Sequence, residues 1–251
     1  MSQAEQTYDL SLLQQSHQKW ERSHALRCYY QSLYKDMLLW CPEGEKRLEI
    51  GSGIGVAKQF IPYLTTSDIV LNEYVDQAAS AYDLAPENHW EAILGLDVLH
   101  HLRYPMRFFE SAARSLEPGG RIILMEPAAT RFGNLLYGLC HHEPMKLAEI
   151  QPPFVFDEQT GDEAFSNMAM AQGLFRVHHD YAEKKLAAMN LHLIHLSYRD
   201  VLAYFLTGGF SRPALLPAWL IRIAVAVEKL LPNPFLRILG VRMLVVVEKQ
   251  V

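Results

Sequence analysis

The stretch Leu-Glu-Ile-Gly-Ser-Gly-Ile-Gly, residues 48–55, decides the fold of this chain. The apolar run up to Ile50 is typical of a buried strand, and the alternating glycines predict a tight turn into a helix that runs to about Tyr63. Glycine adopts positive φ and lets a ligand approach the bare backbone, and a helix start offers free N–H groups. The stretch predicts a loop for a small-molecule cofactor with a carboxylate, an ammonium group or ribose hydroxyls; a plain strand-to-helix turn is the alternative.

The glycine spacing separates this loop from two other kinds of cofactor loop. A dinucleotide fingerprint, G-x-G-x-x-G, requires its third glycine where the chain has Val56. A phosphate loop ends in Gly-Lys-Ser/Thr, which the stretch lacks. The pattern is E-x-G-x-G-x-G, and it resembles the first motif of the class I S-adenosylmethionine (SAM)-dependent methyltransferases.

Residues 93–127 strengthen this resemblance. A buried strand ends at the acid Asp97, and a His-His-Leu turn and an amphipathic helix follow. The segment Pro118-Gly119-Gly120 closes that helix, and a second buried strand ends in Glu-Pro. This order is similar to the fourth and fifth strand motifs of small-molecule SAM methyltransferases of the type 11 kind. The resemblance covers residues 46–127 closely and the final strands loosely.

Strands and helices alternate along the chain, which predicts an α/β fold. We expect a Rossmann-like, mostly parallel, seven-stranded sheet with helices on both faces, an N-terminal helical cap, and helical inserts near the C-terminus. The expected organisation is one methyltransferase domain over residues 1–251, with a helical cap (1–45), a SAM-binding core (46–127) and substrate-side inserts (128–190 and 199–238). The clearest strands are expected at residues 91–96, 121–126, 191–198 and 243–248, with helices at 9–40 and 105–116.

Composition narrows the possible partners and the compartment. The net charge is −5 and the chain has no Lys- or Arg-rich run, so nucleic acid is not expected as a partner. The three cysteines are widely spaced and the first residues are polar, which favours a reducing cytoplasm over secretion. The apolar run 214–231 contains charges and a proline, so we expect it to pack on the sheet or to wall a pocket. Peripheral membrane contact is the alternative, and the oligomeric state is not predicted.

The resemblance implies a role for each end of the cofactor. Glu49, Gly51 and Gly53 are expected to hold the amino-acid end of SAM. Asp68, at the end of the second strand, is expected to accept hydrogen bonds from the ribose, because a carboxylate can accept two at once. Glu73 is its rival, and a turn cap is the other interpretation of Asp68.

The adenine side departs from the usual pattern. Only about 27 residues separate Asp68 from the strand end at Leu96, too few for a helix, a strand and a second helix. We expect a short third strand near residues 75–79 and one helix fewer than usual. We then expect Ser80 and Ala81 to contact the adenine, with Asp83 as the alternative. The full predicted cofactor set is Glu49, Gly51, Ser52, Gly53, Asp68, Ile69, Ser80, Ala81, Leu96 and Asp97.

Histidines follow the strand ends where the reaction would take place. His101 is the predicted catalytic base, needed where the methyl acceptor must lose a proton; a histidine that only packs or caps is the alternative. His141 and His142 are expected to line the substrate wall. No metal is expected, because adjacent histidines do not share a helix face and no His-x-x-x-His pair completes a ligand set.

The expected substrate pocket is apolar, which predicts a hydrophobic small-molecule acceptor that is aromatic, lipid-like or carrier-bound. The product of SAM would be S-adenosylhomocysteine (SAH). A non-catalytic SAM-binding partner that stabilises or regulates another biosynthetic enzyme is the alternative function. A nicotinamide oxidoreductase is disfavoured by Val56. The aromatic candidates, of which most are expected in the core and the rest in the pocket, are Tyr8, Trp20, Tyr29, Tyr30, Tyr137, Phe154, Phe156, Phe175, Tyr204 and Phe210.

Overall fold

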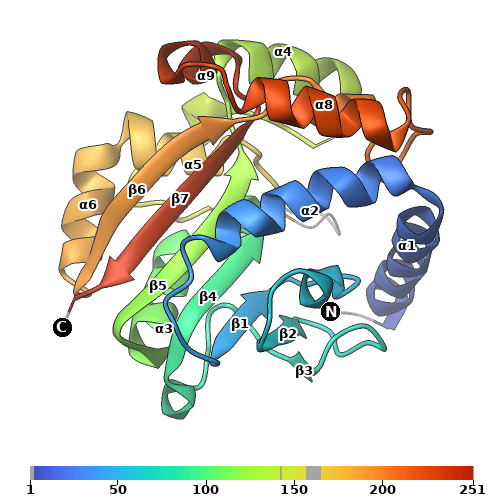
Figure 1. Cartoon of the computed structure of the whole chain (residues 1–251). Coiled ribbons are helices and arrows are strands. Elements are labelled where there is room, and N and C mark those ends of the chain that lie inside the picture. Colours follow the sequence, from blue (N-terminus) through green and yellow to red (C-terminus); the bar gives the residue numbers. More distant parts are fainter. Residues whose placement is uncertain (1–2, 142, 157–164, 251) are drawn as a thin grey trace.

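A seven-stranded, mostly parallel sheet forms the centre of the protein (Figure 1). The structure is a computed structural model that describes residues 3–141, 143–156 and 165–250. The strand order is β3-β2-β1-β4-β5-β7-β6, and β7 alone runs antiparallel to its neighbours, so the predicted fold class is confirmed. The strands are β1 (Arg47–Ile50), β2 (Leu64–Asp68), β3 (Gln77–Ala78), β4 (Trp90–Leu96), β5 (Leu116–Pro127), β6 (Leu191–Arg199) and β7 (Arg242–Lys249).

Strands β4 and β5 are buried on both faces, which explains their nearly continuous apolar sequences. In β5, Ile123 and Met125 face one layer of helices, while Ile122 and Leu124 face the other. The strand order reverses between β1 and β4, whose parallel register pairs Ile50 with Gly95. This reversal places the carboxyl ends of both strands side by side, which is where open α/β sheets bind ligands.

Helices cover both faces of the sheet. On one face α2 (His24–Leu38) packs with α8 (Ala218–Glu228), and on the other lie α3 (Pro105–Ser115) and α6 (His179–Ala187). Figure 1 shows α4, α8 and α9 together along one end of the molecule. The remaining helical segments are α1 (Gln3–Arg22), α4 (Arg131–Cys140), α5 (Met170–Gln172), α7 (Ala203–Leu206), α9 (Asn233–Leu239), η1 (Val56–Gln59), η2 (Pro86–Asn88), η3 (Leu99–His101), η4 (Leu147–Glu149) and η5 (Gly173–Val177).

The N-terminal region is helical as predicted, but it is divided into two helices at Ser23. The Ser23 hydroxyl accepts a hydrogen bond from the Leu26 N–H at 3.2 Å and so caps the start of α2. Trp20, Leu26 and Leu33 are almost fully buried and join the core on this face of the sheet. The cap therefore belongs to the same hydrophobic core as the strands.

The helix predicted after the glycine turn is wrong. The chain forms only the four-residue 3-10 helix η1, and Tyr63 has a φ of +55°. Residues 56–63 are all that separate the last glycine from β2, too short a stretch for a helix and its return to the sheet. The Pro-Gly-Gly segment also differs from its prediction, because α3 ends at Ser115 and the segment lies in the first part of β5.

The region between β2 and β4 is short, as the spacing predicts. Residues 69–89 are all described and form β3 and η2 but no α-helix. The apolar run near the C-terminus forms α8, which buries Ile221 and Val225 against α2. Among the described helices, none combines the length and the apolar composition that crossing a membrane requires.

The Glu228 carboxylate connects α8 to the start of α7. Its oxygens accept hydrogen bonds from the backbone N–H groups of Val201, Leu202 and Ala203 at 2.8, 2.8 and 3.0 Å. We expect Glu228→Ala to lower the free energy of unfolding by about 2–4 kcal/mol, because three backbone donors, two of them buried, lose their acceptor. Urea unfolding measures this change. Glu110→Ala, at an exposed glutamate of α3, is the control and should change the value by less than about 0.5 kcal/mol; equal effects would contradict the role of Glu228.

Candidate cofactor and acceptor site

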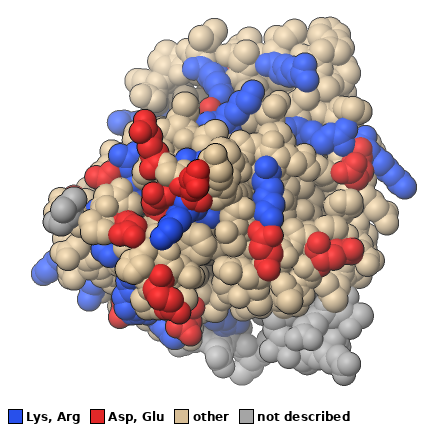
Figure 2. Space-filling view, turned by 60° about the horizontal axis from the view of Figure 1, so that its bottom comes forward, with Lys and Arg blue, Asp and Glu red and all other residues tan. Residues whose placement is uncertain are grey.

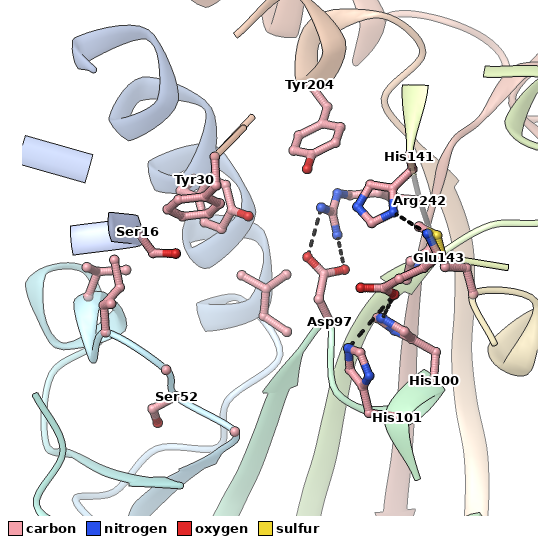
Figure 3. A pocket seen from close by; sticks show the side chains of 18 of the residues that line it. Ser16, Tyr30, Ser52, Asp97, His100, His101, His141, Glu143, Tyr204 and Arg242 are labelled. Carbon is pink, nitrogen blue, oxygen red and sulfur yellow. Dashed lines mark hydrogen bonds and ion pairs between the residues drawn. The ribbon is translucent and has the colours of Figure 1, made fainter. Parts of the chain in front are cut away.

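A cavity of about 390 Å³ lies at the carboxyl ends of β1, β4 and β5 (Figure 3). One wall consists of the glycine loop and helices α1 and α2, and the other carries the histidines and Glu143. Its volume is in the range of small-molecule sites. Of the predicted residues, the cavity is lined by Glu49, Gly51, Ser52, Gly53, Leu96, Asp97 and His101. The predicted residues outside its lining are Asp68, Ile69, Ser80 and Ala81.

The glycine loop needs its glycines for two different reasons. A Cβ on Gly55, whose φ is +62°, would lie 2.0 Å from the Tyr74 carbonyl oxygen, so only glycine lets the loop close against that segment. A Cβ on Gly53, whose φ is +53°, would meet only the Leu13 side chain at 3.7 Å. Gly53 therefore leaves open space beside the backbone, where a ligand can approach.

Asp68 holds this loop against β2. Its Oδ2 accepts a hydrogen bond from the Gly53 N–H at 2.8 Å, and its Oδ1 accepts one from the Ile69 N–H at 2.7 Å. The Ser52 N–H donates to the Ser67 carbonyl at 2.9 Å and adds a second link. Asp68 thus acts as the turn cap that was its alternative interpretation, and a contact with ribose stays a prediction.

The Glu49 carboxyl group lies buried in the cavity wall, and one of its oxygens has no hydrogen-bond partner among the described residues. The residue is 2% exposed, and the oxygen in question is Oε2. Burial raises the pKa of Glu49 to about 7, although hydrogen bonds with Ser52 and Tyr34 lower it. A buried carboxylate oxygen without a protein partner is able to accept a hydrogen bond from a cationic or donor group of a ligand. The ammonium group of SAM is such a group.

The predicted adenine residues lie apart from the cavity. Ser80 and Ala81 follow β3, which is only two residues long. The Ser80 hydroxyl accepts a hydrogen bond from the Tyr82 N–H at 3.2 Å, and so it stabilises the local turn. Ile69 is 65% exposed directly after β2, and Glu73 and Asp83 are also exposed. An adenine contact by these residues stays a prediction.

Arg242 and Asp97 form a buried ion pair across the cavity floor (Figure 3). Asp97 has a φ of +58° at the turn after β4, and Arg242 is 2% exposed at the start of β7. The guanidinium donates to the Asp97 oxygens at 2.6 and 2.9 Å, and its Nε donates to the Tyr29 hydroxyl at 3.0 Å. The sequence interpretation missed Arg242, although a single arginine at the head of the apolar run 241–247 is a detectable signal.

His100 is clamped between two glutamates. Its Nδ1 lies 2.7 Å from Glu126 Oε2, and its Nε2 lies 3.3 Å from Glu143 Oε2. Burial by itself would lower the pKa of His100, but the charge of Glu126 and hydrogen bonds to both carboxylates raise the pKa to about 10. The ring therefore carries its proton at neutral pH. Glu126 is fixed in turn by the N–H groups of Val98 and Leu99.

His101 lines the same cavity as His100, but its imidazole is neutral. Its Nδ1 lies 3.3 Å from the Phe165 carbonyl oxygen, to which it can donate, and this leaves a lone pair on Nε2. Partial burial and the positive charge of His100 lower the pKa of His101. The imidazole is therefore neutral at pH 7 and able to accept a proton.

His100, His101 and Glu143 could also be considered as metal ligands, because three of their ligand atoms lie within 4.8 Å of one another. In the observed arrangement, however, both ring nitrogens of His100 face carboxylate oxygens. Both nitrogens then donate protons, and no lone pair remains for a cation. The absence of a metal stays a prediction.

The aromatic candidates divide between pocket and core. His141 lines the cavity, while His142 and the side chain of Tyr8 lie outside the described residues. Glu143, which the sequence interpretation did not assign, also lines it. The aromatic residues in the lining are Tyr30, Tyr137, Tyr204 and Phe210. Those in or against the core are Trp20, Tyr29, Phe154, Phe156 and Phe175.

Comparisons with known proteins identify the family and the fold. The model of a methyltransferase domain family matches residues 22–165, more than half of the chain. A SAM-dependent methyltransferase from Archaeoglobus fulgidus is similar in structure, with a TM-score of 0.51, 8% identity, and coverage of 88% of this chain and 93% of that one. Among curated proteins, none matches the sequence.

Two further solved structures are similar at lower scores. Magnesium protoporphyrin IX methyltransferase from Synechocystis, with bound SAH, has a TM-score of 0.46, 12% identity, and coverage of 90% of this chain and 86% of that one. A SAM-dependent methyltransferase from Mesorhizobium loti has a TM-score of 0.46, 13% identity, and coverage of 86% and 96%. Neither likeness extends beyond the fold.

The chain belongs to the methyltransferase domain family. Its sheet is that of the class I SAM-dependent methyltransferases, and SAM is its cofactor.

If Glu49 holds the ammonium group of the cofactor, its raised pKa predicts that cofactor binding depends on pH. Only the ionised carboxylate pairs with the ammonium group of SAH, so affinity should rise with pH through neutrality. We expect binding about tenfold weaker at pH 6 than at pH 8, since a carboxyl with a pKa of about 7 is mostly neutral at the first and mostly ionised at the second. Isothermal titration of SAH measures this. Glu49→Gln should bind weakly and lose the pH dependence; constant wild-type affinity would contradict the assignment.

Proposed function

We propose that this protein is an enzyme that transfers the methyl group of SAM to a hydrophobic small-molecule acceptor, which is aromatic, lipid-like or carrier-bound. One observation carries the proposal. The unpartnered Glu49 oxygen and the neutral imidazole of His101 line the same cavity. A group that can bind the cofactor and a group that can accept a proton thus line one cavity. Methyl transfer requires both when the methylated molecule loses a proton.

The cofactor-binding residues follow from this arrangement. Glu49, Ser52 and the backbone of Gly51 and Gly53 would hold the amino-acid end of SAM. Asp68, Ile69, Ser80 and Ala81 would contact the ribose and the adenine, and Leu96 and Asp97 would form the floor of the cofactor site. When bound, SAM supplies a methyl group already activated by its sulfonium, so the protein's main task is alignment.

His101 acts as the general base in this proposal. Its Nε2 accepts the proton of the acceptor, and the carbonyl of Phe165 fixes the other ring nitrogen. Glu143 lies 4.0 Å from Nε2, so its carboxylate stabilises the imidazolium that forms. The protonated His100 keeps the resting pKa of His101 low and thereby keeps the base available.

The acceptor side of the cavity supports an apolar acceptor with one polar group. Tyr30, Tyr137, Tyr204 and Phe210 line the cavity, and Figure 3 shows Tyr30 and Tyr204 on the same side of it as Asp97 and Arg242. Most of the polar groups gather at the histidine side, where a hydroxyl or a similar nucleophile would sit. We also propose that residues 1–45 cap the site over the SAM-binding core (46–127), and that the inserts 128–190 and 199–238 form its acceptor side.

Cytoplasmic location and the exclusion of nucleic acid belong to the same proposal. The three cysteines are free, which suits a reducing compartment. On the face shown in Figure 2, acidic and basic side chains are interspersed, without a continuous basic tract. A backbone phosphate chain would find little complementary charge there.

A second candidate is a non-catalytic SAM-binding partner that stabilises or regulates a biosynthetic enzyme. The shortened η1 and the two-residue β3 favour it, because they abbreviate the ribose and adenine side of the site. Transfer of labelled methyl to any isolated acceptor would exclude it.

Two measurements test the proposed function in order. Isothermal titration with SAM and SAH comes first, and no binding of either at millimolar ligand would refute it. Tritiated SAM is then incubated with the protein and an organic-solvent extract of cellular lipids and small molecules. We expect label in the organic phase together with stoichiometric SAH. Binding without any transfer would favour the second candidate.

Replacing His101 tests the base. We expect His101→Gln to lower kcat by about 10²- to 10⁴-fold while SAH affinity changes little, because the ring accepts the proton without holding the cofactor. At saturating SAM, kcat of the wild type should fall only at a pH below the ordinary histidine value, since the pKa of His101 is lowered and only the neutral ring accepts a proton. His24→Gln, at an exposed histidine of α2, is the control. Unchanged SAH production by His101→Gln would exclude the role.

A further inference from the structure

Helices α4, α8 and α9 carry an unusual share of the exposed apolar side chains. Of the nineteen large apolar residues exposed in the described part of the chain, nine lie on these helices or on the residues flanking α8. Figure 1 places the three helices together at one end of the molecule. Monomeric proteins rarely leave such a concentration without a function.

Helix α8 shows how the surface is organised. Ile221, Val225 and Glu228 face inward, while Trp219, Ile223 and Val227 form a ridge on the opposite side, and Leu230 extends it. Trp219 is 61% exposed and Leu230 is 82% exposed. The spacing of four, four and three residues keeps these side chains on one helical face.

The neighbouring helices α4 and α9 also carry exposed apolar side chains. Phe235 and Ile238 of α9 are more than half exposed, as are Leu135 and Leu139 of α4, and α4 contacts α9 directly. We call the exposed apolar side chains of α4, α8 and α9, with Leu230, the apolar face. Its width over three helices exceeds what one amphipathic peptide would cover.

The exposed charges within the segments that carry the apolar face have one sign, and one of them, Lys229, is paired with Asp36 of α2. In residues 131–140 and 211–239, which are fully described, every exposed charged residue is basic: Arg131, Arg212, Arg222, Lys229 and Arg237. The single acid in these ranges, Glu228, is buried and bonded to backbone N–H groups. The chain as a whole has more acids than bases and a net charge of −5, so exposed acidic residues are depleted in these segments.

We propose that the apolar face docks on the surface of an anionic lipid membrane. Aromatic and aliphatic side chains flanked by Arg and Lys are the pattern of helices that lie in the membrane interface. Each basic residue near an anionic leaflet adds to the attraction. A second copy of the chain is a poorer occupant, because a two-fold contact would bring the exposed basic residues of one copy close to the same residues of the other.

Docking would bring the cavity close to a source of apolar acceptors. The Lys229 ammonium donates to Asp36 of α2 at 2.7 Å, and Asp36 also pairs with Arg199. Helix α7, which carries the cavity residue Tyr204, is held to α8 by Glu228. The apolar face and the acceptor side of the cavity are therefore parts of one connected layer.

Vesicle binding by the full chain tests this proposal independently of any methyl transfer. We expect the protein to co-float with vesicles of phosphatidylcholine and phosphatidylglycerol, and about tenfold less with phosphatidylcholine alone. Brominated lipids should quench Trp219, which is the most exposed tryptophan among the described residues. Raising the salt concentration should weaken binding by screening the basic residues.

Two double variants separate the two contributions. Ile223→Asp with Val227→Asp should reduce vesicle binding about tenfold or more, and Arg222→Glu with Arg237→Glu should abolish the preference for anionic lipid. Leu39→Asp, at an 80% exposed leucine beyond the end of α2, is the matched control and should bind like the wild type. None of these residues lines the cavity, so unchanged SAH affinity verifies that each variant is folded.

Other outcomes overturn the proposal. Absent vesicle binding, or equal binding by the wild type and the Asp double variant, would refute a membrane role for the apolar face. Equal binding to neutral and anionic vesicles would refute the charge argument. Sedimentation velocity tests whether a second copy of the chain covers the apolar face. That conclusion would replace the proposal if the wild type self-associates, the Asp double variant is monomeric, and neither protein binds vesicles.

Discussion

The structure of the site depends on the ion pair between Arg242 and Asp97. A guanidinium that is 2% exposed is tolerable only because carboxylate oxygens and the Tyr29 hydroxyl surround it. Tyr29 donates in turn to Asp200, which pairs with Arg199. This chain of contacts joins the turn after β4, the start of β7 and helix α2. It fixes the cavity floor and the cap as one unit, and losing Asp97 would leave the buried Arg242 guanidinium without its carboxylate.

In the cavity above this ion pair, the neighbours of each ionisable side chain determine its protonation state. Glu49 is buried without a partner for Oε2, so it is easily protonated until a cation arrives. His100 sits between two carboxylates and keeps its proton, and His101 beside it is neutral. Two adjacent histidines thus have opposite protonation states because their neighbours differ. The cavity thereby provides a site for a cation on one wall and a proton acceptor on the other.

Predictions from the sequence were accurate where short-range patterns control structure. The apolar runs at β4, β5 and β7 form strands, and the short spacing after Asp68 correctly indicated a missing helix. The helix expected after the glycine loop was wrong, because local glycine chemistry does not reveal that β2 begins so soon. Asp68 lies at the predicted strand end, yet both its oxygens accept backbone hydrogen bonds that the pattern could not foresee.

By itself, the sequence determined the class of protein, since glycine spacing, strand periodicity and turn residues act between near neighbours. The motif at residues 48–55 and the block at 93–127 were enough to identify a SAM site at the carboxyl ends of the strands. Only the tertiary structure decided which charged groups meet there. Arg242 pairs with an aspartate 145 positions earlier, and Glu143 reaches His100 from another segment. Such pairs depend on how distant elements pack, which no local pattern of residues encodes.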